Sequence, residues 1–261
     1  MIYAGCDLGT VAAKLAIIEN GTILACEMLA YRNLPKQAAA SVLESALSKA
    51  GLKQDEIAYC VATGFGRKRV DYAQADVPEV MCLSRAIRHL APAVRTVIDV
   101  GGQSIRAFNL GENGRVTDST NNEKCAAGTG KFIEVMAKAL ELPLDRLGEL
   151  ALASRDPVSI TTQCGVFAES EVITYVNTGR DRADIIAGIS RSVAGKTASL
   201  VRRISLTEKV ALVGGVAKNA GVVRDLEQEL GIRLAALDVD PQVVAALGAA
   251  LIAQDKSPRS S

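Results

Sequence analysis

The apolar positions of the chain change repeatedly between a two-residue spacing and a helical spacing. In the first 94 residues the pattern predicts strands at 2–7, 13–19, 22–29, 58–64 and 80–83, and helices at 35–51 and 84–91. A further short helix is expected between the last two of these strands. Asn20-Gly21 is typical of a tight hairpin turn. This part of the chain therefore predicts a small sheet with helices packed on it.

The same pattern starts again at residue 95. Residues 95–119 predict strand, turn, strand, turn and strand, and Asp99 stands at the end of the first of these strands, as Asp7 does in the first block. We then expect helices at 128–141, 143–153, 165–178 and 182–204, a strand with a Gly-Gly turn in 209–219, a strand near 232–235 and a helix at 241–254. Two copies of one pattern indicate a duplicated domain and not a solenoid.

Composition narrows the class of protein. Hydrophobic residues make up 49% of the chain and aromatic residues only 3%, which suits alternating helices and strands better than an all-β sandwich. The net charge is +1, so neither a nucleic acid nor a membrane surface is an expected partner. Asp7 interrupts any N-terminal signal, and the apolar run at 243–253 is too short to cross a bilayer. We expect a cytoplasmic α/β protein.

Three turns have the composition of phosphate-binding loops: "DLGT" (7–10), "DVGGQS" (99–104) and "GGVAKN" (214–219). Their glycines let the backbone approach a ligand closely, and successive N–H groups can surround phosphate oxygens. An aspartate beside phosphate is reasonable when Mg²⁺ lies between them, so we expect Asp7 and Asp99 to approach one metal ion from two domains. Such turns also occur without a ligand, but two in matching positions and a third after a late strand favour a phosphate site.

The chain has six cysteines and one histidine, His89, without a C-x-x-C pair, so a conventional zinc site lacks ligands. We expect Cys6, Cys26, Cys60 and Cys82 to pack as small apolar residues, because they lie on or beside apolar segments.

Cys125 and Cys164 each precede a predicted helix, a position that favours a thiolate. Three interpretations remain open on the residues alone. The two cysteines could pack, or Cys125 could be a nucleophile, although no histidine is near it as a base. They could also hold an iron–sulfur cluster, for which a twofold-symmetric dimer would supply the missing pair of thiolates.

The three turns together resemble the phosphate 1, phosphate 2 and adenosine loops of the actin/hexokinase/Hsp70 ATPase superfamily. This resemblance implies two RNase H-like domains with an interdomain nucleotide cleft that closes on ATP. The last helix of that superfamily often returns to the first domain. We therefore expect one domain from 1–94 plus 241–261 and a second domain from 95–240.

The segments "NEKCAAGTGKFIEVMA" and "QCGVFAESEVI" are similar to the two cysteine motifs of the BadF/BadG/BcrA/BcrD ATPase family, in particular of activators of 2-hydroxyacyl-CoA dehydratases. The match runs in order through "ATGFGR", "DIIAGISRSVAGK" and "ALGAALIA". It implies a homodimer with one [4Fe–4S] cluster held by Cys125 and Cys164 of each subunit. It also implies ATP-driven transfer of an electron, from a ferredoxin or flavodoxin, to a separate iron–sulfur dehydratase or reductase in an anaerobe.

On this resemblance we assign Asp7 and Asp99 to Mg²⁺ and Gln103 to positioning of the attacking water. The residues expected at the nucleotide are Gly9, Thr10, Gly101, Gly102 and Ser104 at the phosphates, Gly214 and Gly215 at adenosine, and Thr129, Gly130, Lys131 and Glu134 as weaker candidates. For Lys131 and Glu134, a solvated helix face is an equally good interpretation.

The chain departs from the family pattern at two positions that matter. Ser104 stands where an aspartate is common, which puts in doubt a metal or water role there, and Gly165 replaces a threonine in the second cysteine motif. Three other functions remain as alternatives: the ATPase subunit of a benzoyl-CoA-type reductase, a small-molecule (sugar) kinase of the same superfamily, and a nucleotide-dependent interaction module without catalysis.

Overall fold

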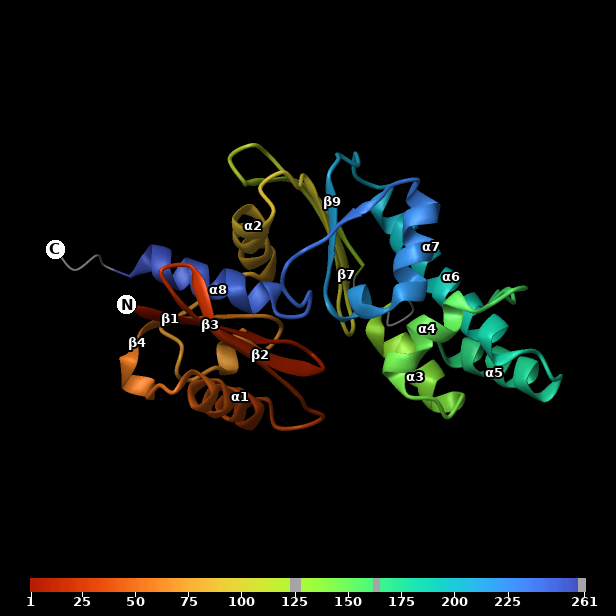
Figure 1. Cartoon of the computed structure of the whole chain (residues 1–261), viewed down its shortest axis with the longest axis horizontal. Coiled ribbons are helices and arrows are strands. Elements are labelled where there is room, and N and C mark those ends of the chain that lie inside the picture. Colours follow the sequence, from red (N-terminus) through yellow and green to blue (C-terminus); the bar gives the residue numbers. More distant parts are fainter. Residues whose placement is uncertain (123–127, 162–164, 258–261) are drawn as a thin grey trace. The chain divides into compact units, whose positions relative to one another are not determined.

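The computed structural model describes residues 1–122, 128–161 and 165–257 (Figure 1). The chain divides into two compact units. The first consists of Met1–Val94, Gly111–Val116 and the segment that starts at Leu237, and the second of Arg95–Leu110 and Thr117–Ala236.

The first unit is a five-stranded sheet covered on both faces. Its strands, in the order β3-β2-β1-β4-β5, are β1 (Ile2–Leu8), β2 (Ala12–Glu19), β3 (Thr22–Ala30), β4 (Ile57–Thr63) and β5 (Ala75–Asp76). Strands β1, β2 and β3 pair antiparallel, whereas β4 lies parallel to β1 and β5 parallel to β4. Short 3₁₀ helices occupy Gln54–Glu56 and Arg67–Arg69.

Alternating side chains of this sheet enter two cores, as the period of a strand requires. Cys6, Leu8 and Leu15 pack with the apolar face of α1 (Pro35–Ala50). Tyr3 and Ile18 pack on the opposite face, against α2 (Glu79–Leu90) and α8 (Val244–Lys256). The last helix is thus part of the first unit.

The predicted strand at 80–83 is wrong, because these residues lie inside α2. Helix α2 begins directly after Pro78 and buries Cys82, Leu83, Ala86 and Ile87 along one side. The short apolar run thus belongs to a helical stripe with i, i+4 spacing. The last strand of this sheet is instead the two-residue β5.

The second unit repeats the same sheet. Its order is β10-β9-β6-β7-β8, with β6 (Thr96–Val100), β7 (Ile105–Leu110), β8 (Val116–Asn121), β9 (Val210–Val213) and β10 (Leu234–Ala235). Strand β7 is antiparallel to β6, whereas β9 and β10 are parallel neighbours on the other side. The predicted duplication is therefore confirmed at the level of strand order.

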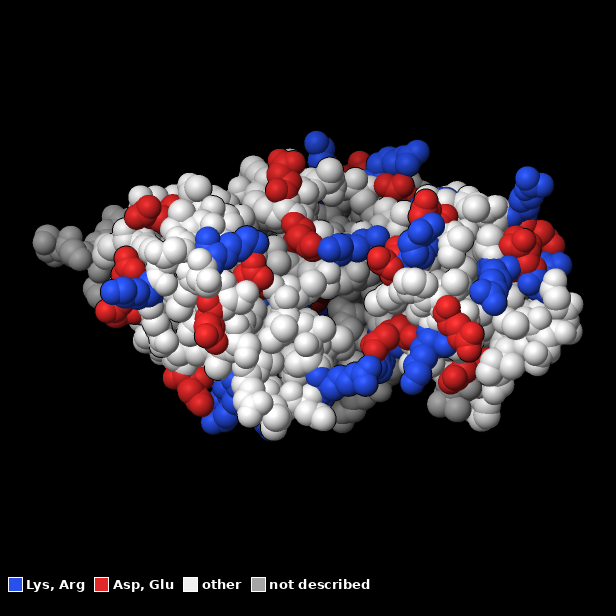
Figure 2. Space-filling model, turned by 60° about the horizontal axis from the view of Figure 1, so that its bottom comes forward, with Lys and Arg blue, Asp and Glu red and all other residues white. Residues whose placement is uncertain are grey.

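Helices build the core of the second unit together with this sheet. They are α3 (Gly130–Ala139), α4 (Leu147–Leu152), α5 (Gly165–Asn177), α6 (Arg182–Val201) and α7 (Ala220–Leu230), with 3₁₀ turns at Leu144–Arg146 and Gly215–Lys218. In the described part of the chain, no helix combines the length and apolar character needed to cross a membrane. Figure 2 shows basic and acidic side chains interspersed on one face, in keeping with a net charge of +1.

Two glycines allow α8 to lie directly on the rest of the first unit. A Cβ atom added to Gly248 would collide with the carbonyl oxygen of Cys82 in α2, and one added to Gly5 in β1 would collide with the backbone of α8 at Ala246 and Ala250. Backbone-to-backbone packing of this kind cannot relax by a change of rotamer. The position of α8 therefore depends on the absence of these two side chains.

We predict that Gly248→Ala lowers the free energy of unfolding by about 1–3 kcal/mol, because the added methyl group forces α8 away from α2. Gly195→Ala in α6 is the matched control, since a Cβ there meets nothing within 4 Å. The control should stabilise the protein by up to about 1 kcal/mol, as alanine favours a helix interior over glycine. Denaturant unfolding followed by circular dichroism measures both, and equal effects of the two substitutions would contradict this packing.

Candidate nucleotide site and cysteine segments

Asp7 is a buried carboxylate at the end of the central strand of the first unit. It is 2% exposed and pairs across the sheet with Lys14, whose Nζ lies 2.9 Å from Oδ2. Its other oxygen, Oδ1, is buried and has no hydrogen-bond partner among the described residues. An unpaired carboxylate oxygen is unfavourable in the interior. The geometry therefore fits a ligand at Oδ1, such as Mg²⁺ or one of its water molecules.

Gly64 keeps the space beside Oδ1 open. It follows Thr63, the residue of β4 that is paired with Asp7, and its φ is +87°. A Cβ at Gly64 would collide with Oδ1 of Asp7. The same turn is held to β1 by the N–H of Gly66, which donates to the carbonyl of Leu8 at 2.8 Å.

The turn after Asp7 is closed by its own backbone. The N–H of Gly9 donates to the carbonyl of Ala12 at 3.1 Å, and the hydroxyl of Tyr31 donates to the carbonyl of Gly9. Thr10 is exposed at the tip of this turn. The "DLGT" segment thus has a fixed backbone and a solvent-accessible hydroxyl.

The second unit contains the same arrangement at Asp99. This aspartate is 5% exposed and pairs across the sheet with Arg106, at 3.3 Å between Nη1 and Oδ2. Gly214 follows the parallel strand β9 with a φ of +88°, and a Cβ there would lie 2.8 Å from Oδ1 of Asp99. Gly215 then begins the 3₁₀ turn Gly215–Lys218.

Sequence reasoning missed the two basic partners and Gly64. The signal was present, because a basic residue follows each aspartate by seven positions, at Lys14 and Arg106. In a strand–turn–strand unit with a short turn, this spacing places the two side chains opposite each other across the pair.

The loop after Asp99 is bound to the start of α3. The N–H groups of Gly130 and Lys131 donate to the carbonyls of Gly101 and Gly102 at 2.9 and 2.8 Å, and the buried hydroxyl of Thr129 also donates to the carbonyl of Gly102 at 2.9 Å. The expected nucleotide candidates Thr129 and Gly130 therefore contact the expected phosphate loop.

The other predicted residues of this region differ in exposure. Gln103 is exposed, and the carbonyl of Ser104 accepts from the N–H of Gly101 at 2.9 Å. Lys131 and Glu134 form an ion pair of 3.0 Å with each other, and both side chains are 42% exposed. The structure therefore places these two on the outer face of α3.

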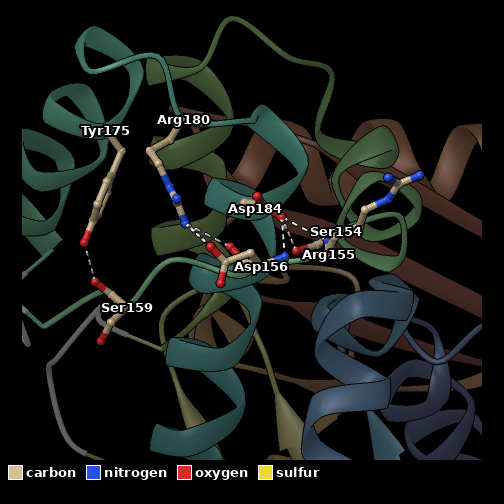
Figure 3. Close-up of polar contacts among 7 residues, drawn as sticks. All are labelled: Ser154, Arg155, Asp156, Ser159, Tyr175, Arg180 and Asp184. Carbon is tan, nitrogen blue, oxygen red and sulfur yellow. Dashed lines mark hydrogen bonds and ion pairs between the residues drawn. The ribbon is translucent and has the colours of Figure 1, made fainter.

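Hydrogen bonds fix the segment that leads toward the second cysteine motif (Figure 3). Oδ1 of Asp184 in α6 accepts from the hydroxyl of Ser154 at 2.7 Å and from the N–H groups of Arg155 and Asp156 at 3.0 and 2.9 Å. The bond from Ser154, followed by those from the backbone, lowers the pKa of Asp184. Arg180 in turn pairs with Asp156 at 2.8 Å.

Helix α5 holds the next part of this segment. The hydroxyl of Tyr175 donates to the carbonyl of Ser159 at 2.9 Å (Figure 3). Both the N–H and the hydroxyl of Thr161 donate to Oε1 of Glu171 at 3.0 Å. The chain is therefore tied to α5 and α6 up to residue 161.

Three of the six cysteines are confirmed as core residues. Cys6, Cys60 and Cys82 are buried among apolar side chains, and burial raises the pKa of all three thiols, to about 12 for Cys6 and Cys82. Cys26 is half-buried, and burial raises its pKa to about 11. These thiols are thus poorly suited to bind a metal.

The two motif cysteines, Cys125 and Cys164, lie outside the described residues. The described residues that follow them converge on one pair of side chains. A Cβ at Gly128 would lie 3.0 Å from Cβ of Lys196, and a Cβ at Gly165 would lie 3.5 Å from the ring of Phe132. Elsewhere in the described ranges, no group of three His, Cys, Asp or Glu side chains is placed to hold a metal ion.

The fold and the paired aspartate turns define the class of protein. The solved structure of a ROK hexokinase from Thermus thermophilus matches with a TM-score of 0.51 at 16% identity, over 98% of this chain and 99% of that chain. This likeness shows the expected actin/hexokinase-type α/β fold.

The chain belongs to the BadF/BadG/BcrA/BcrD ATPase family, whose model matches residues 4–253. It is 39% identical over 260 residues to a 2-hydroxyisocaproyl-CoA dehydratase activator of Clostridioides difficile, covering 100% of this chain and 97% of that protein. It is 38% identical over 256 residues to a (R)-2-hydroxyglutaryl-CoA dehydratase activating ATPase of Acidaminococcus fermentans, covering 98% of each. The solved structure of the Clostridium difficile activator with bound ADPNP matches with a TM-score of 0.95 at 40% identity, over 98% of this chain and 96% of that chain. The resemblance inferred from the motifs is therefore confirmed.

We predict that Asp7→Asn lowers ATPase activity by at least about two orders of magnitude, because the neutral amide would no longer balance the charge of a Mg²⁺ ion held at this position. Steady-state phosphate release measures this effect. Asp71→Asn is the control, since Asp71 pairs with Lys36 on the exposed surface at 3.1 Å. Undiminished turnover in Asp7→Asn would exclude this carboxylate from the reaction.

We predict that Gly64→Ala reduces ATPase activity by about tenfold to a hundredfold, because the added methyl group displaces the carboxylate of Asp7. Gly51→Ala is a matched control: its φ of +68° gives similar backbone strain, but its Cβ meets nothing within 4 Å. That control should lose only about 1–2 kcal/mol of stability. If both variants kept the same activity, the space beside Asp7 would have no catalytic role.

Proposed function

We propose that the protein is an ATP-hydrolysing activator that delivers a low-potential electron to a separate iron–sulfur enzyme of the 2-hydroxyacyl-CoA dehydratase type. The observation that supports this most directly is the full-length similarity to dehydratase activators. A ferredoxin or flavodoxin loses one electron, the partner enzyme gains it, and ATP and water give ADP and phosphate in the same cycle.

The nucleotide part of the proposal assigns each unit its own residues. In the first unit, Asp7 faces Mg²⁺ through Oδ1, while Gly9 and Thr10 face phosphate oxygens. The buried, unpaired Oδ1 of Asp7 supports this assignment. Lys14 compensates part of the charge of Asp7 when no metal ion is present, because its ammonium lies 2.9 Å away.

In the second unit, Asp99 has the same role as Asp7. Gly102 and Ser104 provide backbone and hydroxyl donors for phosphate, and exposed Gln103 positions the attacking water. Gly101 also faces phosphate, but its N–H already donates to the carbonyl of Ser104. Gly214 and Gly215 contact adenosine. The contact of α3 with the loop carbonyls supports a fixed loop, so that its N–H groups are oriented before the nucleotide binds.

The cluster part of the proposal assigns Cys125 and Cys164 as ligands. Two thiolates per chain are half of the four that a [4Fe–4S] cluster takes, so a symmetric homodimer completes the set. Gly128 and Gly165, the first described residues after the two motif cysteines, approach Lys196 and Phe132, which contact each other. When bound, the cluster takes up and releases the single electron.

The four described cysteines are compatible with a reducing cytoplasm as the proposed site of action. All four described cysteines are free thiols. Disulfides are rare in cytosolic proteins.

We predict that anaerobically purified protein contains about four iron atoms per dimer and that Cys125→Ser or Cys164→Ser removes them, because serine lacks the thiolate. Iron analysis together with visible absorbance measures this. Cys26→Ser, at a half-buried position away from the motifs, should keep its iron, as should Asp7→Asn. Full iron content in either motif variant would end the ligand assignment. An iron-free wild-type protein that phosphorylates a sugar would instead support the kinase alternative.

A further inference from the structure

Tyr31 connects the end of β3 to the turn between β1 and β2. Its backbone N–H donates to the carbonyl of Val11 at 3.0 Å, and its hydroxyl donates to the carbonyl of Gly9. This reach follows from the strand register, because β3 runs antiparallel to β2 and Tyr31 continues the chain directly beyond the last paired residue of β3. One residue therefore holds the carbonyl groups on both sides of Thr10.

The bond to Gly9 also fixes the direction of the next N–H group. The C=O of Gly9 and the N–H of Thr10 belong to one planar trans peptide unit, so they point in opposite directions. Among the residues that the structure describes, the N–H of exposed Thr10 has no hydrogen-bond partner, whereas the N–H of Gly9 already donates to the carbonyl of Ala12 at 3.1 Å. The turn thus presents an oriented donor that is open to a ligand.

The ring of Tyr31 also packs, and packing alone is the simpler explanation for this residue. The ring lies against the apolar core that includes the buried face of α1, and so does the ring of Tyr72. The hydroxyl of Tyr72 likewise donates to a backbone carbonyl, that of Ala39 in α1, at 3.0 Å. The two tyrosines therefore have the same kind of packing and the same kind of hydrogen bond. They differ in that Tyr72 is bound to a helix and Tyr31 to the turn after Asp7.

We propose that Tyr31 is a positioning residue for nucleotide binding, whose hydroxyl keeps the N–H of Thr10 oriented toward the phosphate oxygens. This inference rests on the proposed function, which places Gly9 and Thr10 at phosphate. A donor that is oriented in advance binds an anion without the loss of entropy that ordering the loop would require. The same donor contacts phosphate before and during the reaction, so its misalignment weakens nucleotide binding more than it slows the chemical step.

The test is the dissociation constant of Mg²⁺·ADP, measured by isothermal titration calorimetry in Tyr31→Phe and in the matched control Tyr72→Phe. In Tyr31→Phe we expect this constant to rise about fivefold, the effect typical of one neutral hydrogen bond. The KM for ATP should rise by a similar factor, while kcat stays within about twofold of wild type. Tyr72→Phe should keep the wild-type affinity for ADP, although denaturant unfolding should show a similar loss of stability in both variants.

Each outcome bears on one of the two proposals. Unchanged ADP affinity in Tyr31→Phe, or an equal loss of affinity in Tyr72→Phe, would overturn the positioning role and leave Tyr31 as a packing residue. A fall in kcat at unchanged ADP affinity would overturn it as well. A wild-type protein that does not bind ADP would instead reject the nucleotide assignment of the proposed function. Tyr31→Phe removes a single oxygen atom from a half-buried side chain, so we expect the variant to fold.

Discussion

A buried carboxylate at the end of the central strand is the constraint on which each unit depends. Removing Asp7 from water is unfavourable unless its charge is balanced, and Lys14 balances it from the adjacent antiparallel strand. The parallel neighbour must then end in a residue without a side chain, which is Gly64. Asp99 imposes the same requirements on the second sheet. In each unit, the strand order, the turn glycine and the cross-strand cation therefore together accommodate one buried carboxylate.

In the second unit, the loop that follows the buried aspartate is hydrogen-bonded to the first turn of a helix. Because Gly130 and Lys131 bind the carbonyls of the loop after Asp99, that loop and the first turn of α3 form one hydrogen-bonded body. Phe132 is the next residue of the same turn and contacts Lys196. A displacement of the loop by a nucleotide would therefore act on Lys196 through a single helical turn, without a long chain of intermediate contacts.

The sequence predicted the duplicated sheets and the phosphate turns because these depend on local patterns. Asp7 and Asp99 each close an apolar strand, and the following small residues leave few other conformations. The strand predicted at 80–83 failed because four apolar residues fit either period, and only packing against α8 decides for a helix. The cation opposite each aspartate was not predicted, because the seven-residue spacing identifies it only when the register of the strand pair is known.

The burial of the described cysteines limits which thiols could hold the proposed cluster. Burial raises the pKa of Cys6, Cys60 and Cys82, so none of them is suited to supply a thiolate. On the proposed assignment of Cys125 and Cys164, the cluster would take two thiolates from each of two identical chains.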